Sequence, residues 1–176
     1  MNPVSKPTLI RRPMKTKITP FLWFDTQAEE AANFYVGIFP NSKITAVVRY
    51  PDTGKEHHGK EPGSVMVVSF ELDGQALSAL NGGPMFQFSC AVSFAVECET
   101  QEEIDYYWEK LGADGDPSAQ QCGWLADKFG LSWQIVPKIL PELLADTGSP
   151  GALRAMAALM EMRKLDIAAL KKAHAG

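Results

Sequence analysis

The sequence contains few of the residues and runs that mark secreted, membrane-bound or metal-binding proteins. Its 176 residues include only three cysteines and three histidines. Cys90, Cys98 and Cys122 form no CxxC pair and none is close to a histidine, which indicates neither a disulfide framework nor a zinc site. No stretch approaches the roughly 20 apolar residues of a membrane-spanning helix, and no apolar run of a secretory signal follows the basic amino terminus. These absences predict a cytoplasmic chain without a membrane anchor.

Charge is unevenly distributed along the chain. The first 17 residues hold five basic groups and no acidic one, and residues 150–176 hold five basic and two acidic groups. The 7 basic and 19 acidic residues between them give the middle a net charge of −12. Such an acidic body argues against nucleic-acid binding. The basic ends have two interpretations: they grip a partner subunit, or they are a solvated tail and an ordinary amphipathic helix.

The length fits one domain with appended ends. Residues 1–16 mix prolines and basic residues without a period, so we interpret them as a flexible basic lead-in, with Met14 as an alternative natural start. Residues 17–146 are the predicted folded domain. Residues 147–176 are a predicted helical extension: after a Gly-Ser-Pro-Gly break, Ala152 to His174 is rich in helix formers and methionines and predicts one helix.

The folded part begins with a strand–helix pattern followed by three strands, over residues 17–81. Ile18–Phe24 is a short apolar run, and Ala28–Ile38 has apolar residues at helical spacing, with Asp25 or Thr26 as the expected cap. Three segments rich in β-branched or small apolar residues follow, and Asp73-Gly74 predicts a hairpin between the last two. This module therefore has the order β-α-β-β-β.

The same pattern begins again within residues 89–137. Val92–Cys98 predicts a strand and Thr100–Leu111 a helix, and an offset of 73 relates the apolar helix positions of the two copies. The matched pairs are Ala31 and Ile104, Phe34 and Tyr107, Tyr35 and Trp108, and Ile38 and Leu111. The second copy is shorter, so one of its strands must be very short or missing.

Several strings resemble one known family. They are Asn81-Gly82-Gly83-Pro84, Val92-Ser93-Phe94 with Glu97-Cys98, Cys122 to Asp127, Gly130 to Pro137, and the closing Met162 to Ala173. They are similar to the PhnB-like branch of the vicinal oxygen chelate superfamily, the glyoxalase and bleomycin resistance proteins, whose members often carry a demethylubiquinone methyltransferase name. The resemblance implies an α+β fold in which tandem βαβββ modules form a curved mixed sheet around a cavity, plus a C-terminal helix.

In metal-using relatives the first and last strands of each module supply four ligands to a divalent ion. The offset of 73 places Thr19 and Val92 at the first-strand positions, and alignment of Gly74 with Gly130 places Ser78 and Gln134 at the last-strand positions. Valine has no donor atom, and neutral hydroxyl and amide groups do not offset dehydration of the ion. We therefore expect no metal and no other cofactor.

The predicted cavity is aromatic and apolar with sparse polar groups. Strand alternation places Phe21, Trp23, Leu80 and Phe94 on the same face as those four residues. The sequence leaves open which face of the sheet carries Trp124, whereas Trp133 is expected to pack under a helix. Such a lining suits a small, partly aromatic organic ligand. The alternative is a packed sheet interface without a ligand.

Three functions remain open from the sequence. The first is a metal-free, PhnB-like small-molecule-binding homodimer. The alternative is an isomerase, lyase or oxygenase acting on a small hydrophobic substrate, with Glu97 or a histidine of the His57-His58 loop as acid or base. The third is a protein-interaction module with a filled cavity. Methyl transfer is not expected, because the predicted layout lacks a doubly wound sheet and its glycine-rich loop, and Cys122 is expected to be a structural thiol.

Overall fold

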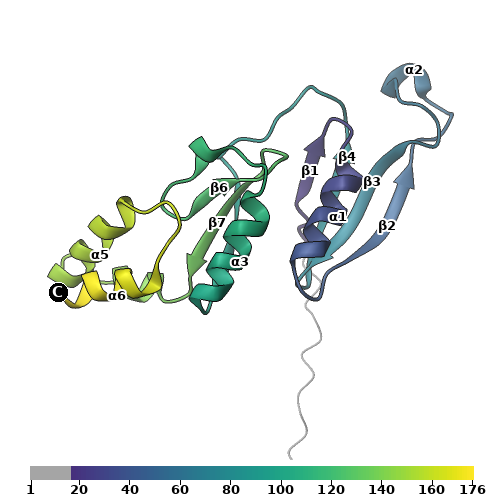
Figure 1. Cartoon of the computed structure of the whole chain (residues 1–176). Helices are drawn as coiled ribbons and strands as arrows, with labels where there is room; N and C mark the ends of the chain where they lie inside the picture. Colours follow the sequence, from purple (N-terminus) through teal and green to yellow (C-terminus); the bar gives the residue numbers. More distant parts are fainter. Residues whose placement is uncertain (1–16) are drawn as a thin grey trace, which may run out of the picture. The chain divides into compact units, whose positions relative to one another are not determined.

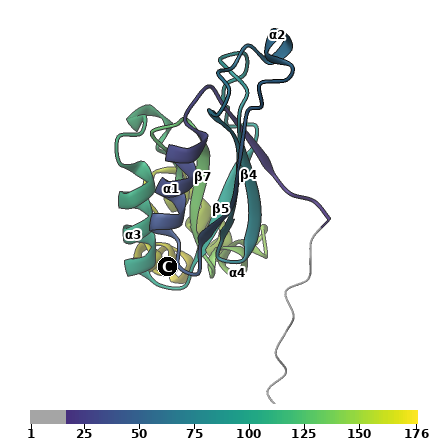
Figure 2. The ribbon, with the colours of Figure 1, turned by 90° about the vertical axis from the view of Figure 1, so that its right-hand side faces the viewer.

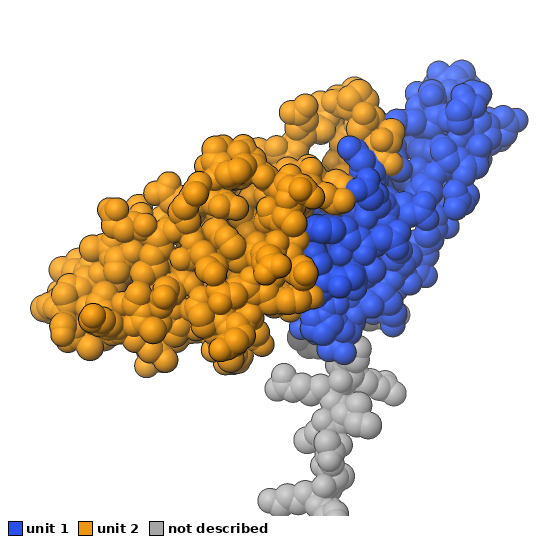
Figure 3. Space-filling model, viewed as in Figure 1, with its two compact units in different colours: residues 1–22, 27–81 blue, residues 23–26, 82–176 orange. Residues whose placement is uncertain are grey.

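The computed structural model describes residues 17–176, and the predicted basic lead-in with its alternative start lies outside the described residues. The described chain divides into two compact units (Figure 3). Unit 1 comprises residues 17–22 and 27–81, and unit 2 comprises residues 23–26 and 82–176.

Unit 1 contains the first module, a helix packed on a four-stranded sheet. Its elements are β1 (Phe21–Phe24), which ends in unit 2, α1 (Ala28–Ile38), β2 (Lys43–Arg49), α2 (Lys55–His58), β3 (Val65–Leu72) and β4 (Gln75–Asn81). The strand order is β1-β4-β3-β2. Helix α1 lies along one face of this sheet, and α2 lies in the connection that extends beyond β2 and β3 (Figures 1 and 2). Tyr35 of α1 is fully buried and stacks on Phe70 of β3, with 6.3 Å between ring centroids.

The predicted hairpin between β3 and β4 is confirmed, whereas the N-cap position of α1 is Gln27 rather than Asp25 or Thr26. Leu72 pairs with Gln75, and Asp73 and Gly74 both have positive φ values, 44° and 84°, as a tight two-residue turn requires. The Gln27 side chain makes no cap hydrogen bond. The Ala28 N–H donates to Oδ1 of Asn81, at the end of β4, over 2.8 Å. A long-range contact thus satisfies the first N–H of the helix.

Unit 2 contains the second module, which has one strand fewer than the first. Its elements are β5 (Ser93–Cys98), α3 (Gln101–Gly112), the 3-10 turn η1 (Pro117–Ala119), β6 (Trp124–Ala126) and β7 (Ser132–Pro137). The strand order is β5-β7-β6, with β5 and β7 parallel and β6 and β7 antiparallel. Where the first module has its second strand, the chain forms η1 and an isolated bridge between Gln121 and Trp124. The prediction of a missing or very short strand is confirmed.

The two module helices bury equivalent residues. Ala31 and its counterpart Ile104 are fully buried, as is Leu111, the counterpart of the nearly buried Ile38. In α3 the Thr100 hydroxyl accepts the Glu103 N–H. The offset of 73 between the two helices therefore marks equivalent positions in the structure.

The carboxyl-terminal extension forms two helices where the sequence predicts one. After α4 (Leu140–Leu144) come α5 (Pro150–Met160) and α6 (Ile167–Ala175). The chain between them leaves helical geometry, and Asp166 starts α6 by accepting the Ala169 N–H. This side-chain cap favours a new helix over continuation of α5. Leu143, Leu159, Leu165 and Leu170 form the core of this region, and none of the described helices is long and apolar enough to cross a membrane.

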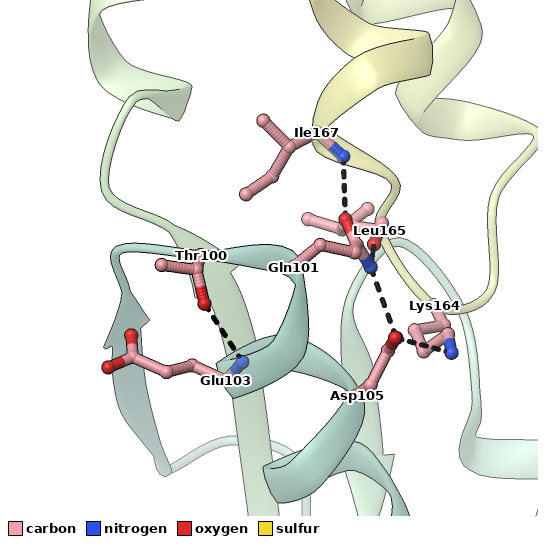
Figure 4. A network of polar contacts seen from close by, with 7 residues as sticks. All are labelled: Thr100, Gln101, Glu103, Asp105, Lys164, Leu165 and Ile167. Atoms are coloured by element: carbon pink, nitrogen blue, oxygen red, sulfur yellow. Dashed lines mark hydrogen bonds and ion pairs between the residues drawn. The ribbon is translucent and has the colours of Figure 1, made fainter.

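Gln101 links the extension to α3 (Figure 4). Its side-chain oxygen accepts the Ile167 N–H over 2.9 Å, and its amide nitrogen donates to the Leu165 carbonyl and to Asp105, each over 3.1 Å. Lys164 completes the group through an ion pair with Asp105. Through these contacts the start of α6 is fixed to the first turns of α3.

Candidate functional site

The first module presents one covered face and one open face. Val68, Phe70, Leu77 and Ala79 are buried on the face that α1 covers. On the other face Ser69 and Ser78 are paired in register, with 3.3 Å between their hydroxyl oxygens, and Leu80 follows two residues later. The Ser78 N–H donates to the Pro20 carbonyl, which places Phe21 beside Ser78. Phe21 is 62% exposed, whereas Ser78 is buried.

Two other predicted positions lie at the start and end of β1. Thr19 is exposed and precedes the strand. The Trp23 indole N–H donates to the Gly83 carbonyl over 2.8 Å, and its ring meets Phe86 edge to face at 5.0 Å. A Cβ at Gly82 would lie 2.2 Å from the Trp23 ring, so this glycine makes room for the indole. Phe86 was missed by sequence reasoning, because it lies in a loop without a periodic pattern.

The predicted face of Phe94 is wrong. Strand β5 pairs Phe94 with Trp133 and Ala95 with Gln134, and the Phe94 and Trp133 rings lie 5.6 Å apart. Neighbours in register point to the same side of a sheet, so Phe94 lies with the buried Trp133 and not with Gln134. Val92 precedes β5 and is 68% exposed.

A one-residue shift between the two modules explains this error. Phe24 and Cys98 both end the first strand of their modules and both are buried, so an offset of 74 relates the strands while 73 relates the helices. A shift of one residue moves every side chain of a strand to the other face. The counterpart of Thr19 is therefore Ser93 rather than Val92, a residue that sequence reasoning missed. An alignment of the apolar residues that end the two strands would have identified Ser93 from the sequence.

The open side of the second sheet brings together aromatic, polar and acidic groups. Trp124 pairs with Gln134, which settles the face of Trp124, and the Gln134 amide nitrogen donates to the Ser93 hydroxyl over 2.8 Å. Glu97 follows Ala95 by two residues and shares this face. We call Ser93, Ala95, Glu97, Trp124 and Gln134 the second-module face. Trp124 and Gln134 are half-buried, and Glu97 is exposed.

The covered side of this sheet is held by a buried carboxylate. Asp127 is 2% exposed, and its Oδ2 accepts the Trp133 indole N–H over 2.9 Å. Its Oδ1 accepts the N–H groups of Phe129 and Leu131, which fixes the turn between β6 and β7. Leu125, the register partner of Trp133, lies against Gly112 of α3, so Trp133 packs on the helix side of the sheet, as predicted.

A lysine at the end of β7 pairs with one of two nearby glutamates. Lys138 forms an ion pair with Glu99, whose hydrogen bond raises the pKa of the ammonium group, with a weaker contribution from Glu97. Within the described part of the chain Glu97 itself makes no ion pair or hydrogen bond. Its carboxylate therefore remains open to a ligand or to solvent.

The cysteines and histidines add no reactive group to this face. Burial, aided by Glu103, raises the pKa of the Cys98 thiol to about 12. Cys122 lies beside the Met160 carbonyl in the extension. His58, in unit 1, stacks on Tyr50 with 4.7 Å between centroids, and its Nδ1 accepts the Lys60 N–H.

The residues at the corrected ligand positions do not fit a divalent metal ion. They are Thr19, Ser78, Ser93 and Gln134. All four are neutral, and Gln134 is hydrogen-bonded to Ser93. Hard cations need carboxylate ligands and softer ones need imidazole or thiolate. The residues described here form no group of three or more such side chains able to hold an ion.

Comparisons with known proteins agree with the fold. The model of the 3-demethylubiquinone-9 3-methyltransferase family matches residues 16–136. A putative 3-demethylubiquinone-9 3-methyltransferase, PhnB protein, from Bacillus cereus is 39% identical, with 69% of this chain and 99% of that chain covered and a TM-score of 0.59. A protein from Pseudomonas aeruginosa, 20% identical, has a TM-score of 0.52 over 69% of this chain and 96% of its own. A search of curated proteins finds no match.

The family match covers both modules and the strings within them, whereas the closing Met162 to Ala173 string lies beyond its end. The chain therefore belongs to the 3-demethylubiquinone-9 3-methyltransferase family, the PhnB-like branch of the vicinal oxygen chelate superfamily.

Proposed function

We propose that the protein binds a small organic ligand on the second-module face, without a divalent metal ion. The observation that carries this proposal is that Trp124, Gln134 and Ser93 share one sheet face with the unpaired carboxylate of Glu97. Ligand sites typically combine apolar surface with a few placed polar groups. The expectation that both modules line one cavity stays a prediction.

The polar groups of this face are oriented before a ligand arrives. The Gln134 amide nitrogen donates to the Ser93 hydroxyl, so the side-chain oxygen of Gln134 remains as an acceptor for a ligand. The Trp124 indole provides a flat apolar surface next to it, since the two residues are register partners. A planar ligand stacked on the indole would meet this oxygen at its edge.

The family name describes a methyltransferase, but the features of this fold favour ligand binding over methyl transfer. Methyl donors are usually held by a doubly wound parallel sheet with a glycine-rich loop after its first strand. Here β1 leads through Asp25–Gln27, without glycine, into α1, and the described sheets have four and three strands. We therefore include S-adenosylmethionine among the probes, with no binding expected.

The test combines mass spectrometry with NMR. Protein purified under mild conditions is examined for a co-purified small molecule, and a fragment set is screened by the indole N–H signals of the four tryptophans. We expect shifts at the Trp124 signal, assigned with Trp124→Phe, that are weakened in Gln134→Ala and unchanged in the exposed control Gln75→Ala. Absence of any shift at Trp124 would contradict the proposal, and one tightly bound metal ion per chain would contradict its metal-free part.

Glu97 supports a second candidate, an isomerase, lyase or oxygenase acting on a small hydrophobic substrate. An exposed, unpaired carboxylate beside a binding face is placed to accept or donate a proton. In that case Glu97→Gln would abolish turnover of an identified ligand while leaving its binding within about threefold. If the parent protein turns over no ligand and Glu97→Gln only weakens binding, the enzymatic candidate is contradicted and the binding function remains.

We further propose a cytoplasmic homodimer. Leu153, Met156 and Met160 are exposed on α5 and are 58%, 42% and 52% accessible, a stripe that a second subunit could cover. Light scattering of the full chain gives its mass directly. A monomeric mass at micromolar concentration would contradict this part of the proposal.

A further inference from the structure

We infer that the second-module face selects small planar cations, such as amidinium or aromatic ammonium groups, over neutral and anionic molecules of the same shape. This inference rests on the proposed function, because it names the ligand class of the same face. It follows from the charges, the hydrogen-bonding capacity and the spacing of the five residues.

The charge on this face is a single negative one. Ser93, Ala95, Trp124 and Gln134 are neutral, so the Glu97 carboxylate is the only formal charge among the five residues. The nearby lysine does not cancel it, because the Lys138 ammonium group is bonded to Glu99 and that pair is neutral as a whole. A cation on the face is therefore attracted to Glu97, and an anion is repelled.

The strongest hydrogen-bonding group on the face is an acceptor. Glu97 offers two charged carboxylate oxygens, and Gln134 adds its amide oxygen, whereas the donors beside them are neutral: the second N–H of Gln134, the Ser93 hydroxyl and the Trp124 indole N–H. A ligand that carries several N–H donors satisfies these acceptors, whereas a carboxylate ligand brings more acceptors. The face of an indole ring also attracts cations, so Trp124 favours the same ligand class.

The spacing of these groups suits one aromatic ring with a cationic substituent. Trp124, Gln134 and Ala95 lie side by side on three adjacent strands, so the outer two are about 10 Å apart. Glu97 lies two residues beyond Ala95, about 7 Å along β5. The diagonal from Trp124 to Glu97 is therefore about 12 Å, so a ring stacked on Trp124 places its charged substituent near the Gln134 oxygen and is attracted to Glu97 across the remaining distance.

Three molecules of nearly identical shape test the inference. Benzamidine is cationic, benzamide neutral and benzoate anionic at pH 7, and each is titrated into full-length ¹⁵N-labelled protein while the Trp124 indole signal is followed. Because Glu97 is exposed, we expect benzamidine to bind about fivefold more tightly than benzamide, with benzoate weakest. In Glu97→Gln most of this preference should be lost, leaving only the small part that the Trp124 indole supplies. The control Glu109→Gln removes an exposed carboxylate of α3 and should change nothing.

The outcomes separate this inference from the function on which it rests. Equal binding of benzamidine and benzamide in the parent protein, or an unchanged preference in Glu97→Gln, would overturn the selection of cations while leaving ligand binding intact. If none of the three shifts the Trp124 signal at tens of millimolar, the face does not bind aromatic molecules and the proposed function fails as well. The amide spectrum of each variant shows directly that it is folded.

Discussion

At Gly82 the lack of a side chain allows the Trp23 indole to lie directly against the backbone. A Cβ at this position would be 2.2 Å from the indole ring, and the neighbouring Gly83 carbonyl accepts the indole N–H. Gly82→Ala must therefore displace Trp23 and break this hydrogen bond. We expect it to reduce the free energy of unfolding by about 2 kcal/mol, measured by urea denaturation.

Gly37 provides the matched control for that substitution. It lies on the exposed side of α1, and a Cβ there would have no atom within 4 Å. Gly37→Ala should stabilise the protein by about 0.5–1 kcal/mol, because alanine favours the helix. Equal effects of the two substitutions would show that Trp23 does not depend on the space at Gly82.

The three cysteines should differ strongly in reactivity. Burial and the nearby Glu103 raise the pKa of Cys98 to about 12, so at pH 8 only about one in 10,000 of these thiols is ionised. Cys90 is exposed and Cys122 half-buried. We expect iodoacetamide to modify Cys90 in the native protein and Cys98 only after denaturation, as peptide mass spectrometry can show. Rapid native modification of Cys98 would contradict the buried position.

At the scale of elements, the two module helices were predicted well and the strand faces less well. Apolar spacing and the offset of 73 located α1 and α3, and both bury the equivalent residues. The predicted face of Phe94 was wrong because the strands of the two modules are related by an offset of 74 and the helices by 73. A shift of one residue moves every strand side chain to the opposite face of the sheet, whereas it turns a helix side chain by less than a third of a turn. The Asn81 cap of α1 and the Asp127 support of Trp133 were not predictable, since both join residues through the folded chain.

The link between α3 and α6 depends on the ionisation of Asp105. Its pKa is lowered, first by the hydrogen bond from Lys164 and then by that from Gln101. A lowered pKa means that the contribution to stability is present above the unfolded-state pKa and is lost as the pH falls through the folded-state value. The contact should therefore be intact at neutral pH and weaken only in acid.

This dependence can be followed at a single amide. The Ile167 N–H donates to Gln101, which in turn donates to Asp105. Its chemical shift should titrate with a midpoint below 3.8, the ordinary value for an aspartate, and Asp105→Asn should abolish that transition. Asp52→Asn, an exposed residue of unit 1, is the control and should leave it unchanged. A persistent transition in Asp105→Asn would assign it to another group.

At the scale of the whole molecule, the extension is part of the body of unit 2. The family match ends at residue 136, yet residues 162 and 163 accept the N–H groups of Cys122 and Gly123, each over 2.8 Å. Leu165 is fully buried and lies against Gly123, whose Cβ would be 3.0 Å from its side chain. The sequence predicted the composition of this segment but not its packing, because its apolar stripe alone does not show which surface it covers.

Two residues of the extension test whether it stabilises unit 2. Leu165→Ala removes a fully buried side chain and should cost about 3 kcal/mol, whereas Lys171→Ala changes an exposed residue of α6 and should cost less than about 0.5 kcal/mol. Hydrogen exchange should locate the loss, with faster exchange in β6, β7 and α3 for Leu165→Ala alone. If the extension were only an appended arm, both variants would leave these amides as protected as in the parent protein, since no core contact would have been removed.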